Sequence, residues 1–293
     1  MNIIEIENLT YSYPAAETPI LKDITLQVEK GDFLAIVGNN GCGKSTFCKT
    51  LNGLIPHFIT GEFSGKVVVD GVNTLEADVG TLAQKAGYVY QDFENQIVRP
   101  TVLDDASYAC LNYAMADYVE RGKEALALCG LEGREGDYIW QLSGGQTHLL
   151  ALAGAVSLRP EVLILDEPTA GLDPRERVRF RNLIHALSGE RIVILSTHIV
   201  SDIETIAGQI IMFRDHRLYC CDSPAHICAQ FQGQVFQLPA GTALAPGQFL
   251  LSEGQGADGP VLRVLCEMPP VNGTPVTPGL EDAFLAIYRE GQP

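Results

Sequence analysis

The sequence predicts an α/β fold whose core is a parallel β-sheet. Short apolar runs at 34–37 (LAIV), 162–165 (VLIL) and 192–196 (IVILS) are typical of buried strands. The first run leads into a glycine-rich stretch, and a helical pattern continues from Phe47. The other two runs are followed by carboxylates and by a histidine. Because parallel sheets hold ligands at the carboxyl ends of their strands, these runs predict a binding site at that edge.

Length and charge narrow the class of protein. With 293 residues, of which 46% are hydrophobic, the chain can hold one large α/β domain and a smaller appendage. A formal net charge of −16 argues against nucleic acid as a partner, because phosphate backbones attract basic surfaces. No apolar run approaches the roughly 18 residues of a membrane span. The start, MNIIEIENLT, lacks the regions of a signal peptide, so we expect a cytosolic protein.

Cysteine usage suits reduced thiols, because the eight cysteines form no C-x-x-C framework. Residue types that can ligate metals gather at His216, Cys220, Cys221, His226 and Cys228. Their spacing matches no standard zinc pattern. We therefore favour a strand followed by a helix that begins at Ser223–Pro224 over a metal site.

The glycine-rich stretch GNNGCGKST has the pattern G-x-x-x-x-G-K-[ST] between a strand and a helix, which is the context of a P-loop. The predicted phosphate cradle consists of Gly38, Asn39, Asn40, Gly41, Cys42, Gly43, Lys44, Ser45 and Thr46. The glycines let the backbone curl around phosphates. Lys44 is expected to neutralise the β- and γ-phosphates, and the Ser45 hydroxyl to ligate Mg²⁺.

Two acidic residues follow the second apolar run. Asp166 is expected to hold the Mg²⁺ shell, and Glu167 to polarise the attacking water as general base. His198 follows the third run. A single histidine is more often structural than functional, but its place at the end of a core strand favours a role in the site. No lysine follows an asparagine, so the Asn-Lys-x-Asp motif of guanine recognition is missing.

Two tyrosines near the start offer a surface for a nucleotide base. In LTYSYP, Tyr11 and Tyr13 share one predicted strand face, and either ring could stack on adenine. Packing against the sheet is the alternative for each ring.

A second anion cradle is predicted from QLSGGQTHLL at 141–150. Ser143, Gly144 and Gly145 stand before an apolar helix, where bare backbone N–H groups and the helix dipole favour an anion. One nucleotide does not need two cradles.

Six motifs occur in a fixed order: GNNGCGKST, YVYQ ending at Gln91, LSGGQ, LILDEP, AGLD at 170–173 and STH at 196–198. This order resembles the nucleotide-binding subunit of an ABC transporter over residues 1–230. The resemblance implies a P-loop NTPase core with a RecA-like parallel sheet, an antiparallel β subdomain and a helical subdomain at about 92–150. A small C-terminal α+β extension would occupy 231–293.

The resemblance also implies ATP and Mg²⁺ as ligands and a second ATPase subunit as partner, in a homodimer or a heterodimer. In that family two subunits meet head to tail, and the signature segment of one closes over the ATP held by the other. Here that segment is Leu142, Ser143, Gly144, Gly145 and Gln146. The two cradles would therefore serve nucleotides on different subunits.

Individual roles follow from the same resemblance. Tyr13 matches the aromatic residue that stacks on adenine, and Gln91 matches the glutamine that contacts Mg²⁺ and couples to the membrane subunit. Asp173 matches an aspartate at the dimer interface. His198 matches the histidine that holds the γ-phosphate and the attacking water. Transmembrane permease subunits would be separate chains, which places this one at the cytoplasmic face of the membrane.

One departure from the family follows the signature segment. The usual Lys or Arg, Gln and Arg are replaced by Thr147, His148 and Leu149. We expect this change to remove a water-facing polar contact from the helix and to leave the sandwiching of ATP intact.

Different segments of the chain resemble the ATPases of different kinds of transporter. The segment from Gln91 to Gln96 resembles the ATPases of energy-coupling-factor and cobalt-type importers, which energise uptake of vitamins or metal ions. STHIVSDIETIA and the tail at 278–288 instead resemble ATPases of peptide, lantibiotic or drug exporters. We favour import. A soluble ABC ATPase of repair or translation is a distant alternative. The acidic charge of the chain and its single cassette argue against it.

The C-terminal part is rich in Gly and Pro and predicts three short strands, at 234–238, 248–252 and 261–265. An amphipathic helix is expected at 280–288. We favour a cap that covers apolar sheet surface over a regulatory site.

Overall fold

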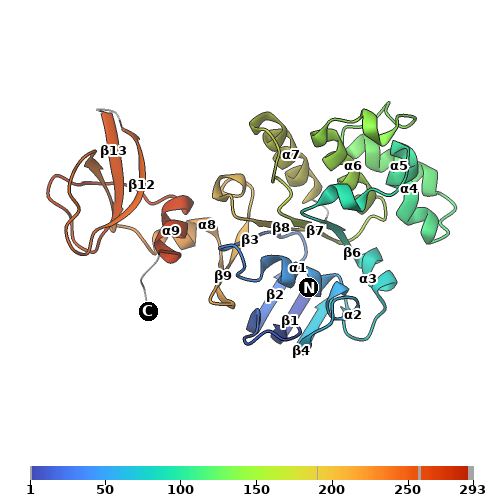
Figure 1. Cartoon of the computed structure of the whole chain (residues 1–293), viewed down its shortest axis with the longest axis horizontal. Helices are drawn as coiled ribbons and strands as arrows, with labels where there is room; N and C mark the ends of the chain where they lie inside the picture. Colours follow the sequence, from blue (N-terminus) through green and yellow to red (C-terminus); the bar gives the residue numbers. More distant parts are fainter. Residues whose placement is uncertain (1, 190, 257–258, 290–293) are drawn as a thin grey trace. The chain divides into compact units, whose positions relative to one another are not determined.

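The computed structural model describes residues 2–189, 191–256 and 259–289 (Figure 1). The chain divides into two compact units. The first contains the residues up to His198 together with Ile211–Cys221, and the second contains Ile199–Ile210 and the residues from Asp222 onward. This division differs from the boundary expected at residue 230. The 199–210 segment belongs with the tail because the backbone N–H of Leu280 donates to Glu204 Oε1 at 3.3 Å.

A six-stranded sheet forms the core of the first unit, in the order β10-β9-β3-β8-β7-β6. Its strands are β3 (Phe33–Val37), β6 (Ala86–Val89), β7 (Val162–Asp166), β8 (Ile192–Thr197), β9 (Gln209–Arg214) and β10 (Arg217–Asp222). β3, β8, β7 and β6 are parallel neighbours. Every residue of β3, β7 and β8 is buried, which confirms the three strands predicted from the apolar runs.

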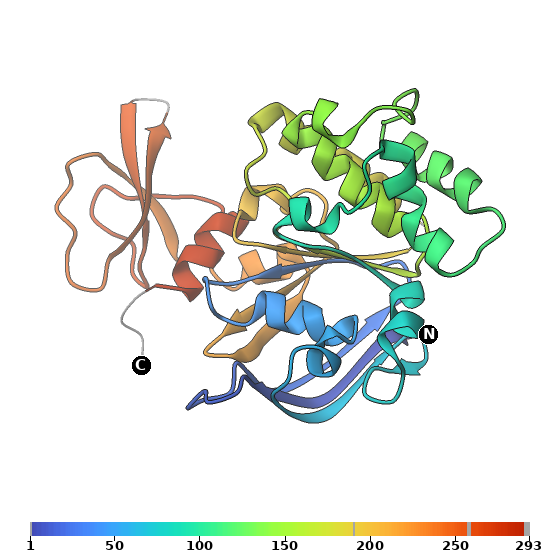
Figure 2. The same cartoon turned by 45° about the vertical axis from the view of Figure 1, so that its right-hand side comes forward.

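The first unit also contains an antiparallel sheet of four strands, in the order β2-β1-β4-β5. Its strands are β1 (Asn2–Ser12), β2 (Leu21–Glu29), β4 (Glu62–Val69) and β5 (Val72–Asn73). Helix α1 (Lys44–Leu51) lies between the two sheets (Figure 2), and its Phe47 is buried in one cluster with Leu26 of β2 and Ile164 of β7. This shared core fixes the start of α1 at the carboxyl edge of the parallel sheet.

Helices cover the other side of the parallel sheet (Figure 2). They are η1 (Phe93–Gln96), α4 (Val102–Asn112), α5 (Tyr118–Leu128), η2 (Ile139–Gln141), α6 (Gly144–Val156) and α7 (Pro174–Leu187). Two short helices, α2 (Leu54–His57) and α3 (Val79–Lys85), connect the sheets. The α/β class with antiparallel and helical additions is therefore confirmed, and the helix that begins at the signature segment runs on to Val156.

The second unit contains its own sheet, in the order β12-β13-β11-β14. Its elements are η3 (Val200–Asp202), α8 (Pro224–Ala229), β11 (Val235–Pro239), β12 (Phe249–Gly256), β13 (Gly259–Leu265), β14 (Thr274–Pro275) and α9 (Leu280–Ile287). Separate hydrophobic clusters form around Phe236 and around Val235, on opposite faces of β11. Ser223 caps α8, with Pro224 in its first turn, as the sequence predicts.

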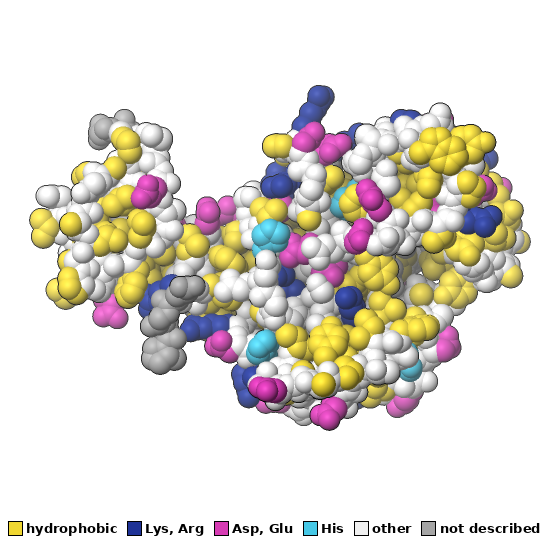
Figure 3. Space-filling model, viewed as in Figure 1, with side chains coloured by type: hydrophobic (Ala, Val, Ile, Leu, Met, Phe, Trp, Pro, Cys, Tyr) yellow, Lys and Arg dark blue, Asp and Glu magenta, His cyan; other side chains and the backbone are white. Residues whose placement is uncertain are grey.

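The surface of the second unit includes several large apolar side chains, and Figure 3 shows yellow patches over its visible face. Its sheet is tied to α9 by a bidentate ion pair, in which Arg263 donates to both carboxylate oxygens of Asp282. Over the whole described chain, no helix is both long enough and apolar enough to span a bilayer.

Candidate nucleotide site

The P-loop joins β3 to α1. Gly41 and Gly43 have φ values of 79° and 112°, which side chains other than glycine rarely adopt. A Cβ at Gly43 would also lie 2.8 Å from the Ile20 carbonyl oxygen. The loop therefore needs glycine at this point to pass close to the neighbouring chain and present its backbone N–H groups at the start of α1.

Lys44 is buried, and its ammonium group lies over the loop. Nζ donates to the carbonyl oxygens of Gly38 at 2.9 Å and of Asn39 at 3.3 Å. It also lies 3.6 Å from Oε1 of Glu167. A buried ammonium group beside the start of a helix is an arrangement that binds phosphate oxygens.

Asp166 is the last residue of β7, and its carboxylate accepts hydrogen bonds from three hydroxyl groups. Ser45 Oγ donates to Oδ1 at 2.9 Å, Ser196 Oγ to the same oxygen at 2.6 Å, and Tyr88 OH to Oδ2 at 3.0 Å. Carboxylate and hydroxyl oxygens are the ligands that Mg²⁺ prefers, so Ser45 and Asp166 fit the predicted metal site. Burial raises the pKa of the Tyr88 phenol, which keeps it a donor to the carboxylate.

Ser196 and Tyr88 are two residues of the site to which the sequence motifs assign no role. Ser196 stands directly opposite Asp166 in the parallel register of β7 and β8, and Tyr88 comes from β6 on the other side of β7. The STH motif contained the serine, but only the strand pairing shows which carboxylate it contacts.

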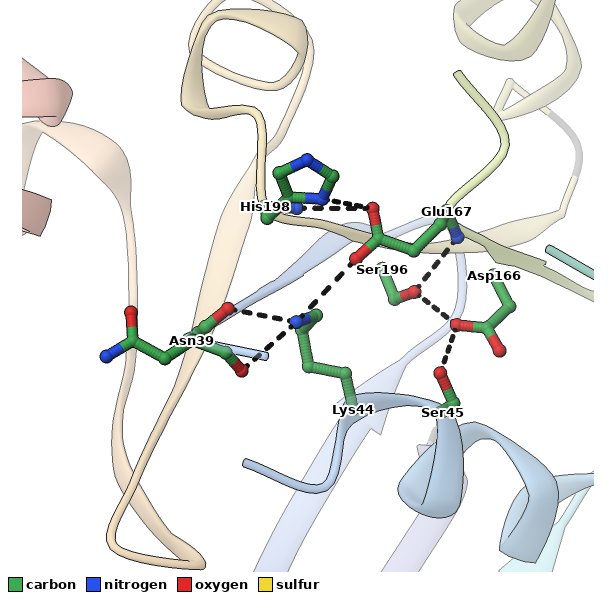
Figure 4. A network of polar contacts seen from close by, with 8 residues as sticks. Asn39, Lys44, Ser45, Asp166, Glu167, Ser196 and His198 are labelled. Carbon is green, nitrogen blue, oxygen red and sulfur yellow. Dashed lines mark hydrogen bonds and ion pairs between the residues drawn. The ribbon is translucent and has the colours of Figure 1, made fainter. Parts of the chain in front are cut away.

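Glu167 lies between two basic side chains (Figure 4). Its Oε2 is 2.8 Å from Nδ1 of His198, while Oε1 faces Lys44. The residue follows the end of β7 with a φ of 51°, and its backbone N–H donates to the Ser196 carbonyl oxygen at 3.0 Å. This left-handed turn aims a buried carboxylate into the site, as a general base requires.

These side chains open into a cavity of about 450 Å³ above the P-loop. Its lining consists of Tyr13, Ile20, Asn40, Gly41, Gly43, Lys44, Ser45, Thr46, Gln91, Glu167 and His198. The structure thus brings together residues from four of the six motifs, including Gln91 from the loop after β6. Cys42 is a buried residue of the P-loop, and burial raises the pKa of its thiol.

The two tyrosines have different surroundings. Tyr11 is fully buried in β1, and its hydroxyl donates to the Thr60 carbonyl oxygen at 3.0 Å. Tyr13 lies just beyond the end of β1 in the cavity lining, with its hydroxyl 3.0 Å from Oγ1 of Thr46. The structure therefore places Tyr13, and not Tyr11, where a base could stack.

The signature segment lies outside the cavity above the P-loop. Ser143 caps α6: its Oγ accepts from the Gln146 N–H at 3.3 Å, and Gln146 Oε1 accepts from the Ser143 N–H at 3.0 Å. Ser143, Gly145 and Gln146 line a separate cavity of about 120 Å³ with residues of α7. None of the residues from Leu142 to Gln146 is among those that line the P-loop cavity.

Asp173 caps the neighbouring helix α7, where its Oδ1 accepts from the N–H groups of Arg175 and Glu176, both at 2.8 Å. Glu176 in turn lies against the signature segment. A Cβ at Gly145 would be 2.2 Å from Glu176 Oε1, whereas a Cβ at Gly144 would meet nothing within 4 Å. The loop that contains Asp173 and the signature segment are therefore packed side by side in one subunit.

The expectation of a water-facing position after the signature segment was wrong. Leu149 is only 5% exposed and His148 is 0% exposed. α6 is buried on most of its circumference, because it packs against α4, α5 and η1. Only Thr147 of the three stays near solvent, where its Oγ1 donates to the Ser143 carbonyl oxygen at 3.0 Å.

Known proteins with similar sequences bind ATP according to their names, as the residues of this site lead us to expect. The family described as ABC transporter matches residues 21–170. A protein of Pyrococcus abyssi assigned as an ABC transporter ATP-binding protein is 39% identical over 231 residues, which cover 78% of this chain and 82% of the relative. A counterpart in Methanosarcina acetivorans is 38% identical over 229 residues, covering 77% of this chain and 69% of the relative.

Solved structures show the same likeness. CbiO1 from Clostridium perfringens, part of the ABC transporter complex cbiONQ, superposes with a TM-score of 0.70 at 29% identity, covering 78% of this chain and 91% of that one. The cassette MJ0796, dimeric and bound to ADP and Pi, superposes with a TM-score of 0.65 at 26% identity, covering 75% and 98%. With its P-loop, acidic strand end and signature segment in place, this chain belongs to the ATP-binding subunits of ABC transporters: it is an ATPase whose ligands are ATP and Mg²⁺.

Proposed function

We propose that the chain pairs with a second ATPase subunit around ATP and powers uptake of a vitamin or a metal ion through separate membrane subunits. The position of Glu167 between Lys44 and His198 is the observation that carries the hydrolytic part of this proposal. The sequence of the segment from Gln91 to Gln96, together with the likeness to CbiO1, supports the importer class.

Hydrolysis would use the residues of the P-loop cavity. Tyr13 stacks on the adenine, and the N–H groups of Gly38–Thr46 with Lys44 hold the phosphates. Glu167 accepts a proton from the attacking water, while His198, hydrogen-bonded to that carboxylate, orients the water and the γ-phosphate.

Ser45, Asp166 and Gln91 would hold Mg²⁺, because their oxygens lie in or beside the same cavity. When bound, the ion neutralises charge on the phosphates.

A second subunit is needed to complete the site. The serine hydroxyl and N–H groups of Ser143–Gly145 lie in their own cavity and not over the P-loop of the same chain. Head-to-tail pairing would bring them onto the partner's γ-phosphate, with Asp173 at the interface. ATP would then stabilise the closed dimer more than the open subunit, and hydrolysis would release it.

The membrane partner is expected to contact the region after Gln91. A groove of about 260 Å³ lies between β6, α3, α4 and α6, and its lining includes Tyr90, Gln96, Val98 and Tyr108. Most of its exposed lining is apolar. We propose that it receives an amphipathic helix from a permease subunit, at the cytoplasmic face of the membrane.

The segment between Gln91 and Gln96 is tightly anchored to both sides of this groove. Gln96 Oε1 accepts from the Tyr90 N–H at 3.2 Å, and its Nε2 lies 3.4 Å from the Ala151 carbonyl oxygen of α6. A movement of the permease helix in the groove would therefore displace Gln91 and the helix that begins at the signature segment.

Affinity purification tests the importer assignment. The tagged full chain is expressed in its native cells, membranes are solubilised in detergent, and the bound proteins are identified by mass spectrometry. Small membrane proteins that bind a vitamin or metal ion support import. Recovery of a six-span exporter permease would show that the tail resemblance was the correct guide. Recovery of ribosomes or DNA without membrane proteins would contradict a transport role altogether.

A further inference from the structure

His148 is a fully buried imidazole at the second turn of α6. Neither ring nitrogen has a hydrogen-bond partner among the described residues. Its ring stacks on Phe93, with centroids 4.0 Å apart and planes inclined by 19°. Its other neighbour is Phe180, at 4.8 Å and 48°. Because the imidazole makes no hydrogen bond to a described residue, we expect it to act through its shape and its flat faces.

Phe93 belongs to η1, two residues after Gln91, so the first ring contact ties the 91–96 segment to α6. A second tie lies three residues further along the helix, where Gln96 Nε2 approaches the Ala151 carbonyl oxygen. Residues three apart share one face of a helix. The 91–96 segment is therefore fastened to a single face of α6 at two points.

Phe180 belongs to α7, whose cap is Asp173. One turn nearer the start of both helices, the carboxylate of Glu176 lies against Gly145 of the signature segment. α7 thus touches α6 at Gly145 and at His148. Because of these contacts, a shift of α7 relative to α6 would displace either the signature segment or the ring of His148.

We propose that His148 is a positioning residue for ATP hydrolysis, whose ring sets the relative placement of the segments that carry Gln91, Ser143 and Asp173. This inference rests on the proposed function, in which Ser143 closes over the partner's nucleotide. The ring lies at the junction where these three segments meet, and it sets the spacing between η1 and α7 because it stacks on Phe93 and makes a tilted contact with Phe180. A branched aliphatic side chain would fill similar space, but it offers no flat face to Phe93.

Two substitutions in the full chain separate these properties. His148→Leu keeps an apolar side chain and removes the ring, whereas His148→Phe keeps a ring and removes the nitrogens. Leu126→Ala, at a fully buried position of α5, is the control for lost packing away from the junction. The measurements are the Tm, the Kd for MgADP, and the kcat and KM for ATP at a temperature where every variant is folded.

His148→Leu should lower kcat by about tenfold or more and leave the Kd for MgADP within about twofold, because the P-loop is not altered. His148→Phe should keep about half of the wild-type kcat or more, and Leu126→Ala should lower the Tm while its kcat stays within about twofold. A wild-type kcat for His148→Leu would overturn the inference. Equal losses in the Leu and Phe variants would overturn it too. If His148→Leu does not fold, Phe93→Leu tests the same contact from the other side, with the same expected loss of kcat.

ATP-dependent dimerisation distinguishes this inference from the proposed function. Glu167→Gln alone should form a nucleotide-bound dimer on size-exclusion chromatography, and adding His148→Leu should weaken that dimer. If Glu167→Gln forms no dimer, the proposed closure around ATP fails, and the kcat comparison alone decides the role of His148. A dimer of unchanged strength in the double variant, with normal kcat for His148→Leu, contradicts only the inference.

Discussion

Glu167 and His198 are joined by a hydrogen bond of 2.8 Å between Oε2 and Nδ1, although 31 residues separate them in the chain. Glu167 follows the end of β7, and His198 follows the end of the adjacent parallel strand β8. The carboxylate is almost entirely buried, while about half of the imidazole side chain is exposed to the cavity. This places the basic oxygen of Glu167 at the wall of the cavity, where it can accept a proton from a water molecule.

Glu167→Gln should retain nucleotide binding and lose turnover, because an amide cannot accept the proton of the attacking water. The kcat should fall by about 100-fold or more, which is the usual contribution of a general base. A coupled assay for released phosphate measures the rate, and size-exclusion chromatography with ATP should show a trapped dimer. Glu161→Gln, at an exposed ion pair with Lys30, is the control and should keep the wild-type rate. A wild-type rate in Glu167→Gln would exclude this carboxylate as the base.

Tyr13→Ala should weaken ATP binding by roughly 1–2 kcal/mol, which is the typical energy of stacking a base on an aromatic ring. Isothermal titration calorimetry measures this change. Tyr11→Ala should instead lower the free energy of unfolding by about 3 kcal/mol or more, because it empties a fully buried site in β1. If Tyr11→Ala weakens ATP binding in a stably folded protein and Tyr13→Ala does not, Tyr11 is the residue that stacks on the base.

The signature segment and the P-loop can be tested in a mixture of two inactive subunits. Ser143→Arg leaves an intact P-loop but cannot complete the partner's site, and Lys44→Ala has the opposite defect. Each variant alone should be nearly inactive. A mixed dimer combines the good P-loop of the first with the good signature segment of the second, so part of the ATPase rate should return.

Mixing ratios provide the control for this experiment. Activity should peak near an equal mixture if the two elements act across a homodimer. No ratio would restore activity if both elements served the nucleotide of the same subunit. In an obligate heterodimer, the same two changes are placed on the two different chains.

Acid should destabilise the first unit through His148. Burial lowers the pKa of this imidazole from 6.5 to about 4, so between these values the unfolded chain binds a proton that the folded chain does not. The contribution of the neutral ring is fully present above pH 6.5 and is lost as the pH falls towards 4, by roughly 3 kcal/mol in total. Urea unfolding between these pH values measures it.

His148→Phe removes this titration and serves as the reference. The difference in unfolding free energy between the variant and the wild-type protein should grow as the pH falls, because other acidic and histidine groups contribute equally to both. A difference that stays constant over this range would show that His148 is protonated as readily in the folded protein as in the unfolded one.

Local sequence determined the elements of the nucleotide site that depend on short stretches of backbone. The P-loop follows from glycines at positions with positive φ between an apolar strand and a helix, and the capping of α6 follows from Ser143 and Gln146 three residues apart. Asp166 and Glu167 could be assigned for the same reason, since a buried strand that ends in carboxylates delivers them to the edge of a sheet. β11, β12, β13 and α9 of the second unit were likewise predicted from composition and turn residues, whereas β14 was not.

Only the tertiary structure decided which distant groups meet. Ser196 contacts Asp166 because β7 and β8 pair in one register, and Tyr13 rather than Tyr11 faces the cavity because β1 ends at Ser12. The burial of His148 was missed because the helical period of α6 does not reveal that Phe93 and Phe180 cover it from two other segments. Local motifs depend on the φ/ψ preferences of a few residues, whereas these contacts depend on packing between elements far apart in the chain, which no short stretch of sequence encodes.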